Sequence, residues 1–191
     1  MKTKTILITG GESGVGAATA RALAAQGHRV LFTCREAEDG AQLCNDITTA
    51  FPRATVKNYS LDLASFSSIR LLADKLQREY NQIDVLINNA SLAPLTKQKT
   101  RDGFELQFGA NYLGHFLFTQ LLLDVLNEAG RARIVHTSSM MHWLGGVDFG
   151  SFHGDKFYDP IRAYAQSKLA ILLFSNELSR RLKKTKITSN T

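Results

Sequence analysis

The sequence is poor in cysteine and contains no long uninterrupted apolar run. Its two cysteines, Cys34 and Cys44, are too few for a disulfide framework, and no cysteine and histidine spacing predicts a metal site. Two reduced thiols in a cytoplasmic protein are the simplest interpretation. The amino terminus MKTKTILITGG lacks the apolar stretch of a signal peptide. The most apolar stretch, HFLFTQLLLDVL, is interrupted by Gln120 and Asp124, so we expect a buried helix and no membrane span.

Low-complexity segments, internal repeats and linkers rich in proline, glycine or serine are also absent from the sequence. The 191 residues, 44% hydrophobic and 21% charged, predict one domain spanning residues 1–191. The formal net charge of +6 raises the question of a nucleic-acid or anionic-membrane partner. However, the positive charge is densest in SRRLKKTK, where it complements the dipole of a helix end, and aromatic residues do not alternate with it. We therefore expect no nucleic-acid partner.

Short apolar runs alternate with segments of helical periodicity along the whole chain. Strands are expected within residues 4–10, 28–34, 53–63, 83–90 and 131–139, and helices within 16–27, 38–51, 65–80, 103–128 and 159–184. Ser65 and Asp159 are the expected caps of two of these helices, and Pro160 follows at a first helical position. This alternation predicts a parallel sheet between two layers of helices, with ligands bound beyond the carboxyl ends of the strands.

A glycine-rich turn, ITGGESGVGAATARAL, joins the first expected strand to the first expected helix. A tight turn and the close approach of a pyrophosphate both favour residues without a Cβ, and a helix N-terminus offers unpaired N–H groups to an anion. Gly10, Gly14 and Gly16 follow the spacing G-x-x-x-G-x-G instead of G-x-G-x-x-G, and no P-loop lysine comes after them. The turn is a candidate phosphate site, with an ordinary strand-to-helix turn as the alternative.

A tyrosine and a lysine lie four residues apart in YAQSK and therefore share one helix face. An ammonium such as that of Lys168 favours the phenolate of Tyr164 and makes proton exchange near neutral pH more accessible. The pair by itself is also compatible with an ordinary surface helix. However, Ser138 and Ser139 end a strand in HTSS, and Asn111 follows another strand. The predicted sheet brings these polar groups to one edge.

The motifs TGGESGVG, NNAS, SS and YAQSK, in this order and spacing, resemble the short-chain dehydrogenase/reductase family. The similarity runs from about Thr3 to about Lys186. The segments TCRE, DGFELQFGANYLGHFLFTQLLL and GDKFYDPIRAYAQSKLAILLFSNEL are most similar to the retinol-dehydrogenase-like branch. The resemblance implies a Rossmann-type doubly wound parallel α/β sheet. It also implies an NAD(P)-dependent oxidoreductase that interconverts a carbonyl and an alcohol by hydride transfer.

The resemblance further implies roles for single residues. Tyr164 would be the proton donor or acceptor, and Lys168 would bind the nicotinamide ribose and lower the proton affinity of the tyrosine. Ser139 would hydrogen-bond the substrate oxygen, with Ser138 as the weaker candidate, and Asn111 would help to hold a water that relays protons. The dinucleotide would contact Tyr164 and Lys168 together with Gly10, Ser13, Gly14, Val15, Gly16, Arg35, Asp62, Leu63, Asn89 and Ala90.

The choice of dinucleotide depends on the end of the second expected strand, where Arg35 follows Cys34. A carboxylate at this place would bind the adenosine ribose 2′-OH, whereas arginine suits a 2′-phosphate. We therefore expect NADP(H) to be preferred, with NAD(H) as the alternative. A solvent-facing Arg35, or repulsion of the phosphate by Glu12, would argue against this preference.

The sequence departs from the family pattern at two places. Ser91 stands where the family usually has glycine after NNA. The chain ends at KITSNT, where family members start another strand followed by further sheet and a substrate-covering segment, so C-terminal strands are expected to be missing. The sheet edge beside residues 131–139 is then exposed unless KITSNT or a partner chain covers it. A non-catalytic nucleotide-binding or interaction protein is therefore the alternative function.

The expected partners are a small carbonyl or alcohol substrate and a second copy of the chain. Met140, Met141, Trp143 and Leu144 follow the candidate serines and suit an apolar substrate, although they are equally compatible with packing. Family members often pair through the helices that carry NYLGHFLF and YAQSKLA, so the resemblance offers a homodimer as one assembly and leaves the oligomeric state open.

Overall fold

The computed structural model describes residues 2–12, 14–154 and 158–191. Six strands form one sheet in the order β3-β2-β1-β4-β5-β6, and all neighbouring pairs are parallel. The strands are β1 (Thr5–Thr9), β2 (Arg29–Cys34), β3 (Thr55–Ser60), β4 (Val85–Asn88), β5 (Arg133–His136) and β6 (Thr188–Asn190). The doubly wound parallel sheet predicted from the sequence is thereby confirmed, and the carboxyl ends of all strands meet at one edge.

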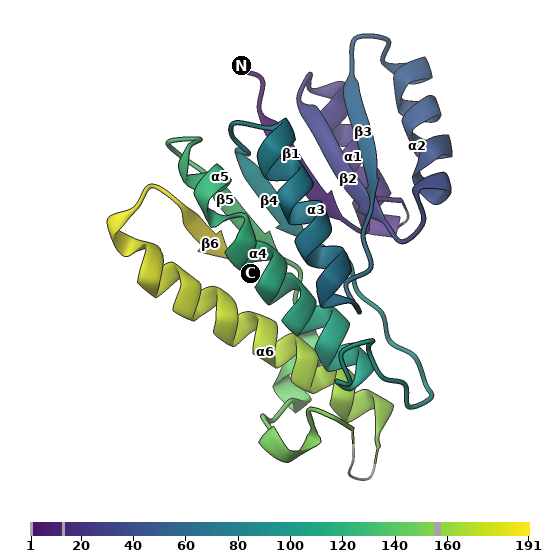
Figure 1. Cartoon of the computed structure of the whole chain (residues 1–191), viewed down its shortest axis with the longest axis vertical. Coiled ribbons are helices and arrows are strands. Elements are labelled where there is room, and N and C mark those ends of the chain that lie inside the picture. Colours follow the sequence, from purple (N-terminus) through teal and green to yellow (C-terminus); the bar gives the residue numbers. More distant parts are fainter. Residues whose placement is uncertain (1, 13, 155–157) are drawn as a thin grey trace.

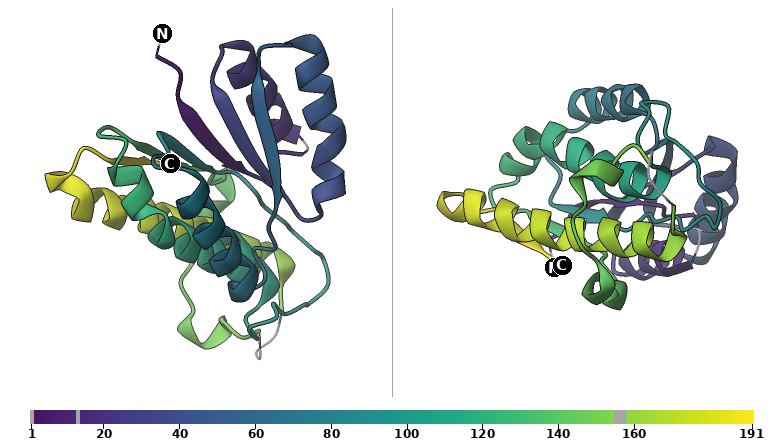
Figure 2. Two further views of the ribbon diagram at one scale, coloured as in Figure 1. Left: turned by 45° about the horizontal axis from the view of Figure 1, so that its top comes forward. Right: turned by 90° about the horizontal axis from the view of Figure 1, so that it is seen from below.

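Helices cover both faces of the sheet (Figures 1 and 2). They are α1 (Gly14–Ala25), α2 (Ala37–Ala50), α3 (Phe66–Glu79), the π-helix η1 (Phe108–Gly114), α4 (His115–Leu121), α5 (Leu123–Asn127), the 3₁₀ helices η2 (Met140–Leu144) and η3 (Phe149–Ser151), α6 (Pro160–Arg181) and the 3₁₀ helix η4 (Leu182–Lys184). Helices α1 and α2 pack on one face through Ala20 and Ile47. Helices α3, α4, α5 and α6 pack on the other through residues such as Phe118 and Phe174.

The expected helix caps are present. Ser65 accepts the N–H of Ser68 at the start of α3, and the carboxylate of Asp159 accepts the N–H groups of Ile161 and Arg162 at the start of α6. Pro160 begins α6, where its missing N–H would have had no helical partner.

The single helix expected over residues 103–128 was wrong in two respects. The carboxylate of Glu105 accepts the N–H groups of Gln107 and Phe108, so the helical segment starts after this residue. It then passes through the π-helical turn η1 and is interrupted at Leu122 between α4 and α5. A side-chain cap and a π-turn depend on packing partners from distant segments, which a periodic pattern does not contain.

The segment KITSNT lies beside β5. KITSNT contributes β6, which pairs with β5 in the register Ile134 to Ser189. The hydroxyl of Ser189 also lies 3.0 Å from that of Ser175 on α6, so the strand is fixed to the helix that precedes it. This segment of the chain therefore covers the sheet edge beside β5.

Among the helices that the structure describes, none combines the length and apolar character needed to cross a bilayer.

Candidate functional site

A cavity of about 400 Å³ opens at the carboxyl ends of the strands. The residues after β1, β2, β3, β4 and β5 all contribute to its wall, as expected for a ligand site in a parallel sheet. The predicted dinucleotide residues that line it are Gly10, Gly14, Val15, Arg35, Asp62, Leu63, Asn89 and Ala90, together with Asn111. Ser91, which replaces the glycine usual in the family, lines it as well.

Four other predicted residues do not line the cavity: Gly16, Ser139, Tyr164 and Lys168. Ser13 lies outside the described residues. A larger cavity of about 600 Å³ is bordered by Glu105, Asp148 and the first turn of α6. Leu144 lines it, and none of the predicted catalytic or dinucleotide-binding residues does. The smaller cavity is the better candidate because it collects side chains from five strand ends.

The glycine turn leaves room at the wall of the cavity. Gly14 has φ +53° and no atom within 4 Å of the place where a Cβ would stand, so the first turn of α1 is open toward a ligand. Gly16, by contrast, has no space for a side chain, because a Cβ there would overlap the carbonyl oxygen of Gly10. No acidic side chain stands in the described part of the first turn of α1, so its unpaired N–H groups remain available to an anion. The turn therefore fits a pyrophosphate.

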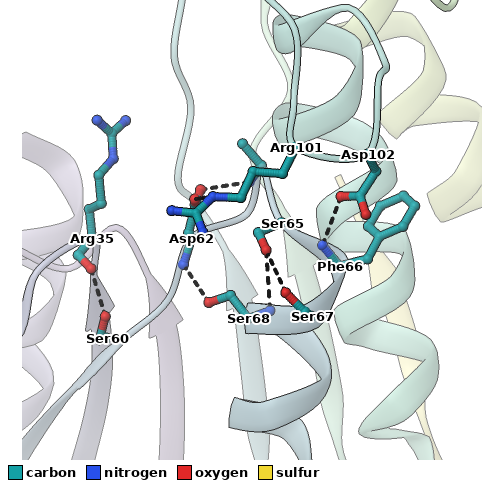
Figure 3. A network of polar contacts seen from close by, with 10 residues as sticks. Arg35, Ser60, Asp62, Ser65, Phe66, Ser67, Ser68, Arg101 and Asp102 are labelled. Atoms are coloured by element: carbon teal, nitrogen blue, oxygen red, sulfur yellow. Dashed lines mark hydrogen bonds and ion pairs between the residues drawn. The ribbon is translucent and has the colours of Figure 1, made fainter.

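The end of the cavity beside β2, where the adenosine is predicted to bind, holds charges of both signs (Figure 3). The Arg35 guanidinium is exposed and extends away from Asp62 and Arg101, and within the described residues it has no hydrogen bond or ion pair. Glu12 lines the same cavity, and its Oε2 is buried without a partner among the described residues. The Arg35 guanidinium could therefore bind a phosphate, and the Glu12 carboxylate could accept a hydrogen bond from a hydroxyl.

Asp62 is held in place by the loop that precedes η1. Its Oδ1 accepts the N–H of Ala64 at 2.9 Å, and its Oδ2 lies 3.7 Å from Nε of Arg101. The neighbouring carboxylate of Asp102 accepts the N–H of Phe66 at the start of α3 (Figure 3). Local sequence patterns do not predict the contact between Asp62 and Arg101, because the two residues belong to different crossovers.

Lys168 is buried under the ring of Tyr164. Its Nζ lies 5.4 Å from the ring centroid and donates a hydrogen bond of 3.0 Å to the carbonyl oxygen of Thr137, which lines the cavity. Only 1% of Lys168 is exposed, and this burial lowers the pKa of its ammonium to about 8. An amine with such a pKa is still mainly protonated at neutral pH, so its charge can lower the proton affinity of Tyr164, as the predicted role requires.

The two serines after β5 have different contacts. Ser138 donates its hydroxyl to the carbonyl oxygen of Lys168 at 3.0 Å, which ties the strand end to α6. Ser139 caps η2 and accepts the N–H of Met141 at 3.2 Å, and within the described residues its own hydroxyl proton has no acceptor. Ser139 is thus the better placed of the two to donate to a substrate oxygen.

Asn111 lies in the π-turn and joins three segments. Its Oδ1 accepts the N–H of Leu92, and its Nδ2 donates to the carbonyl oxygen of Leu92 and, at 3.2 Å, to the hydroxyl of Ser167. The hydroxyl of Ser167 in turn donates to the carbonyl oxygen of Tyr164. The Asn111 side chain therefore fixes the loop after β4 against the helix that carries Tyr164 and Lys168. A water-holding role for Asn111 stays a prediction.

Sequence reasoning missed several residues that support these groups. Thr9, Thr137, His115 and Ser167 are all bonded to segments that are distant in sequence or to the candidate residues themselves. The one available signal was the spacing of four residues between Asn111 and His115, which places both on one helix face.

The strand order, the turn before α1 and the cavity beyond the strand ends define a Rossmann-type dinucleotide-binding protein. The chain belongs to the short-chain dehydrogenase family, whose model matches residues 4–191. Retinol dehydrogenase 11 from Homo sapiens is 43% identical over 186 residues, which cover 97% of this chain and 58% of the relative. The resemblance to the retinol-dehydrogenase-like branch is confirmed. The chain spans less than three fifths of the length of this curated relative.

Solved structures agree with this assignment. The crystal structure of an uncharacterized protein from Mycobacterium Paratuberculosis has a TM-score of 0.87 and 40% identity, and the match covers 97% of this chain and 66% of that one. The RhlG/NADP active-site complex from Pseudomonas aeruginosa has a TM-score of 0.79 and 25% identity, covering 98% of this chain and 70% of that one.

Proposed function

We propose that this chain binds NADP(H) and carries the proton-transfer residues of an oxidoreductase that interconverts a carbonyl and an alcohol. The observation that carries the proposal is the burial of Lys168 beneath Tyr164, bonded to the strand end that borders the dinucleotide cavity.

In this proposal, separate residues bind the dinucleotide, orient the substrate oxygen and transfer the proton. The glycine turn and the N-terminus of α1 hold the diphosphate, while Asn89 and Ala90 form the wall beside it. When bound, the nicotinamide supplies or accepts the hydride. Tyr164 gives a proton to the substrate oxygen or takes one from it, Ser139 donates a hydrogen bond to that oxygen, and Lys168 stabilises the phenolate.

We base the preference for NADP(H) on the free guanidinium of Arg35, which suits a phosphate on the adenosine ribose. The NADP that RhlG binds in its complex is in keeping with this choice. Glu12 opposes it, since its unpartnered oxygen would repel the phosphate and would accept a ribose hydroxyl of NAD(H). Comparison of the KM values for NADPH and NADH tests the preference.

An apolar substrate is favoured by the surface beside Ser139. Met140, Trp143 and Leu144 are 85%, 81% and 68% exposed, so they are not packing residues of the chain itself. They belong to η2, which follows Ser139 directly in the chain, and Leu144 borders the larger cavity. The name of the human relative denotes retinol as its substrate, which is an apolar alcohol.

The direct test combines binding with turnover. The chain is titrated with NADPH and NADH by cofactor fluorescence, and is then assayed with a panel of apolar aldehydes, ketones and alcohols. Saturable NADPH binding with turnover of at least one apolar member supports the proposal. NADPH binding without any turnover would instead favour a non-catalytic nucleotide-binding protein. The homodimer remains a prediction, and native mass spectrometry of the same samples tests it.

A further inference from the structure

The buried imidazole of His115 bridges the end of β1 and the π-turn η1. Only 2% of this residue is exposed, and it does not line the dinucleotide cavity. Its Nε2 lies 2.8 Å from Oγ1 of Thr9, and its Nδ1 lies 2.8 Å from the carbonyl oxygen of Asn111. One ring therefore connects the strand that leads into the glycine turn with the helix that carries Asn111.

The two hydrogen bonds fix the tautomer of the ring. A carbonyl oxygen only accepts, so Nδ1 carries the proton and donates it to Asn111. Burial lowers the pKa of His115 to about 4, and the nearby charge of Lys168 acts in the same direction. The ring is therefore neutral at ordinary pH, and its unprotonated Nε2 accepts the hydroxyl proton of Thr9.

The hydroxyl of Thr9 connects the His115 ring to the wall of the cavity. With its proton given to His115, the hydroxyl uses its lone pairs to accept the N–H groups of Asn89 at 2.9 Å and Ala90 at 3.0 Å. Asn89 also donates its side-chain amide to the carbonyl oxygens of Thr9 and Gly10. Both Asn89 and Ala90 line the dinucleotide cavity, so one hydroxyl holds the backbone of two residues of its wall.

The other end of the ring acts on the π-turn. The backbone N–H of His115 is directed to the carbonyl oxygen of Tyr112. The carbonyl oxygen of Asn111 accepts a hydrogen bond from Nδ1 of the His115 ring. The Asn111 side chain bonds Ser167, and Ser167 bonds the carbonyl oxygen of Tyr164. Through these bonds, the contact between His115 and Asn111 is connected to helix α6, which carries Tyr164 and Lys168.

We propose that His115 is a positioning residue that couples the dinucleotide-binding turn to the proton-transfer groups, by holding the Thr9 hydroxyl and the Asn111 carbonyl in one fixed arrangement. The proposal rests on the proposed function, since it concerns the binding of NADPH and the subsequent turnover. His115 itself does not line the cavity, and its ring contacts Asn111 at the backbone carbonyl oxygen.

Three substitutions separate the two bonds. H115F keeps a planar ring but loses both bonds. H115N keeps an N–H near the position of Nδ1, and H115Q keeps an acceptor near the position of Nε2. For H115F we expect the Kd for NADPH to rise roughly tenfold and kcat to fall roughly tenfold or more, because a buried bond is lost at each end. Because the proposal couples the two ends through one ring, H115Q and H115N, which each keep one bond, should restore neither the Kd nor kcat fully.

The experiment measures NADPH binding by fluorescence, kcat on a substrate of the parent chain, and thermal unfolding of every variant. The control is H28F, which also replaces a buried histidine but lies before β2, at the opposite edge of the sheet. It should change unfolding alone. If H115F does not fold, T9V should show the same loss of NADPH affinity, and T9S should retain it. In the parent chain, ¹⁵N NMR should show His115 protonated on Nδ1.

The outcomes can be separated. Absence of NADPH binding in the parent chain overturns the proposed function and the coupling with it. Parental Kd and kcat in a folded H115F, parental Kd in T9V, or a ring protonated on Nε2 overturns the coupling alone. Full recovery of the Kd by H115Q together with full recovery of kcat by H115N would also contradict it, because the two bonds would then act separately and the ring would couple nothing.

Discussion

The ammonium of Lys168 lies 5.4 Å from the centroid of the Tyr164 ring and is hydrogen-bonded to the carbonyl oxygen of Thr137. The side chains of α6 are thereby tied to the end of β5, at the edge of the sheet where the dinucleotide cavity opens. Position, charge and burial of this pair lead to the following expectations.

Replacing Tyr164 with phenylalanine should remove the proton-transfer group and leave the cavity intact. We expect kcat to fall by about 10²- to 10⁴-fold, with the Kd for NADPH changed little. Y80F is a matched control, because Tyr80 bonds Tyr59 at the far end of α3. Steady-state kinetics and a fluorescence titration check both variants. Turnover by Y164F at the parental rate would assign the proton to another group.

Lys168 should make stability depend on pH. Burial lowers the pKa of its ammonium from 10.5 to about 8, which corresponds to about 3 kcal/mol. Below pH 8 the amine is protonated in both folded and unfolded chains, and the folded state carries the full penalty of burying the charge. Between about pH 8 and 10.5 the unfolded chain binds more protons, so this contribution to the free energy of unfolding rises with pH.

The test compares the parent with K168M in urea at several pH values. The free energy of unfolding of the parent, measured relative to K168M, should rise by up to about 3 kcal/mol from pH 8 to 10.5. Lys75 is an exposed lysine of α3, and K75M should show no such trend. A constant difference between parent and K168M over this range would mean that the buried amine has an ordinary pKa.

Arg35 and Glu12 should move the dinucleotide preference in opposite directions. For R35A we expect the Kd for NADPH to rise roughly 10- to 100-fold, because a bond to a charged group is lost, and the Kd for NADH to stay near the parental value. E12Q should tighten NADPH binding, because it removes a negative charge beside the same phosphate. R29A, at the other end of β2, is the control for a lost surface arginine. Equal weakening of both dinucleotides in R35A would contradict the assignment.

Substitution of Gly14 and of Gly27 separates the effect of backbone strain on stability from the effect of a blocked cavity on NADPH binding. Both have positive φ and open space at the Cβ position, so alanine should cost about 1–2 kcal/mol of stability at either site. Only G14A places a methyl group at the wall of the cavity, where we expect the Kd for NADPH to rise at least roughly tenfold. Thermal unfolding and binding titrations separate the two effects. Unchanged affinity in G14A would move the diphosphate away from this turn.

Much of the fold followed from the sequence because its signals are local. Alternating apolar runs and helical periodicity predicted the parallel sheet, and Ser65, Asp159 and Pro160 marked helix starts that the structure confirms. The glycine turn and the YAQSK helix face were also recognisable, since each depends on residues a few positions apart. The helix over residues 103–128 was mispredicted because Glu105 caps its start and the π-turn displaces its register.

The sequence by itself determined the order of strands and helices, the glycine turn and the shared face of Tyr164 and Lys168. The tertiary structure alone decided that His115 reaches Thr9 over 106 positions of sequence, that Arg101 faces Asp62, and that β6 pairs with β5. The physical reason is that periodicity and propensity act within a few residues. Contacts between crossovers arise only when packing of both sheet faces brings the strand ends together.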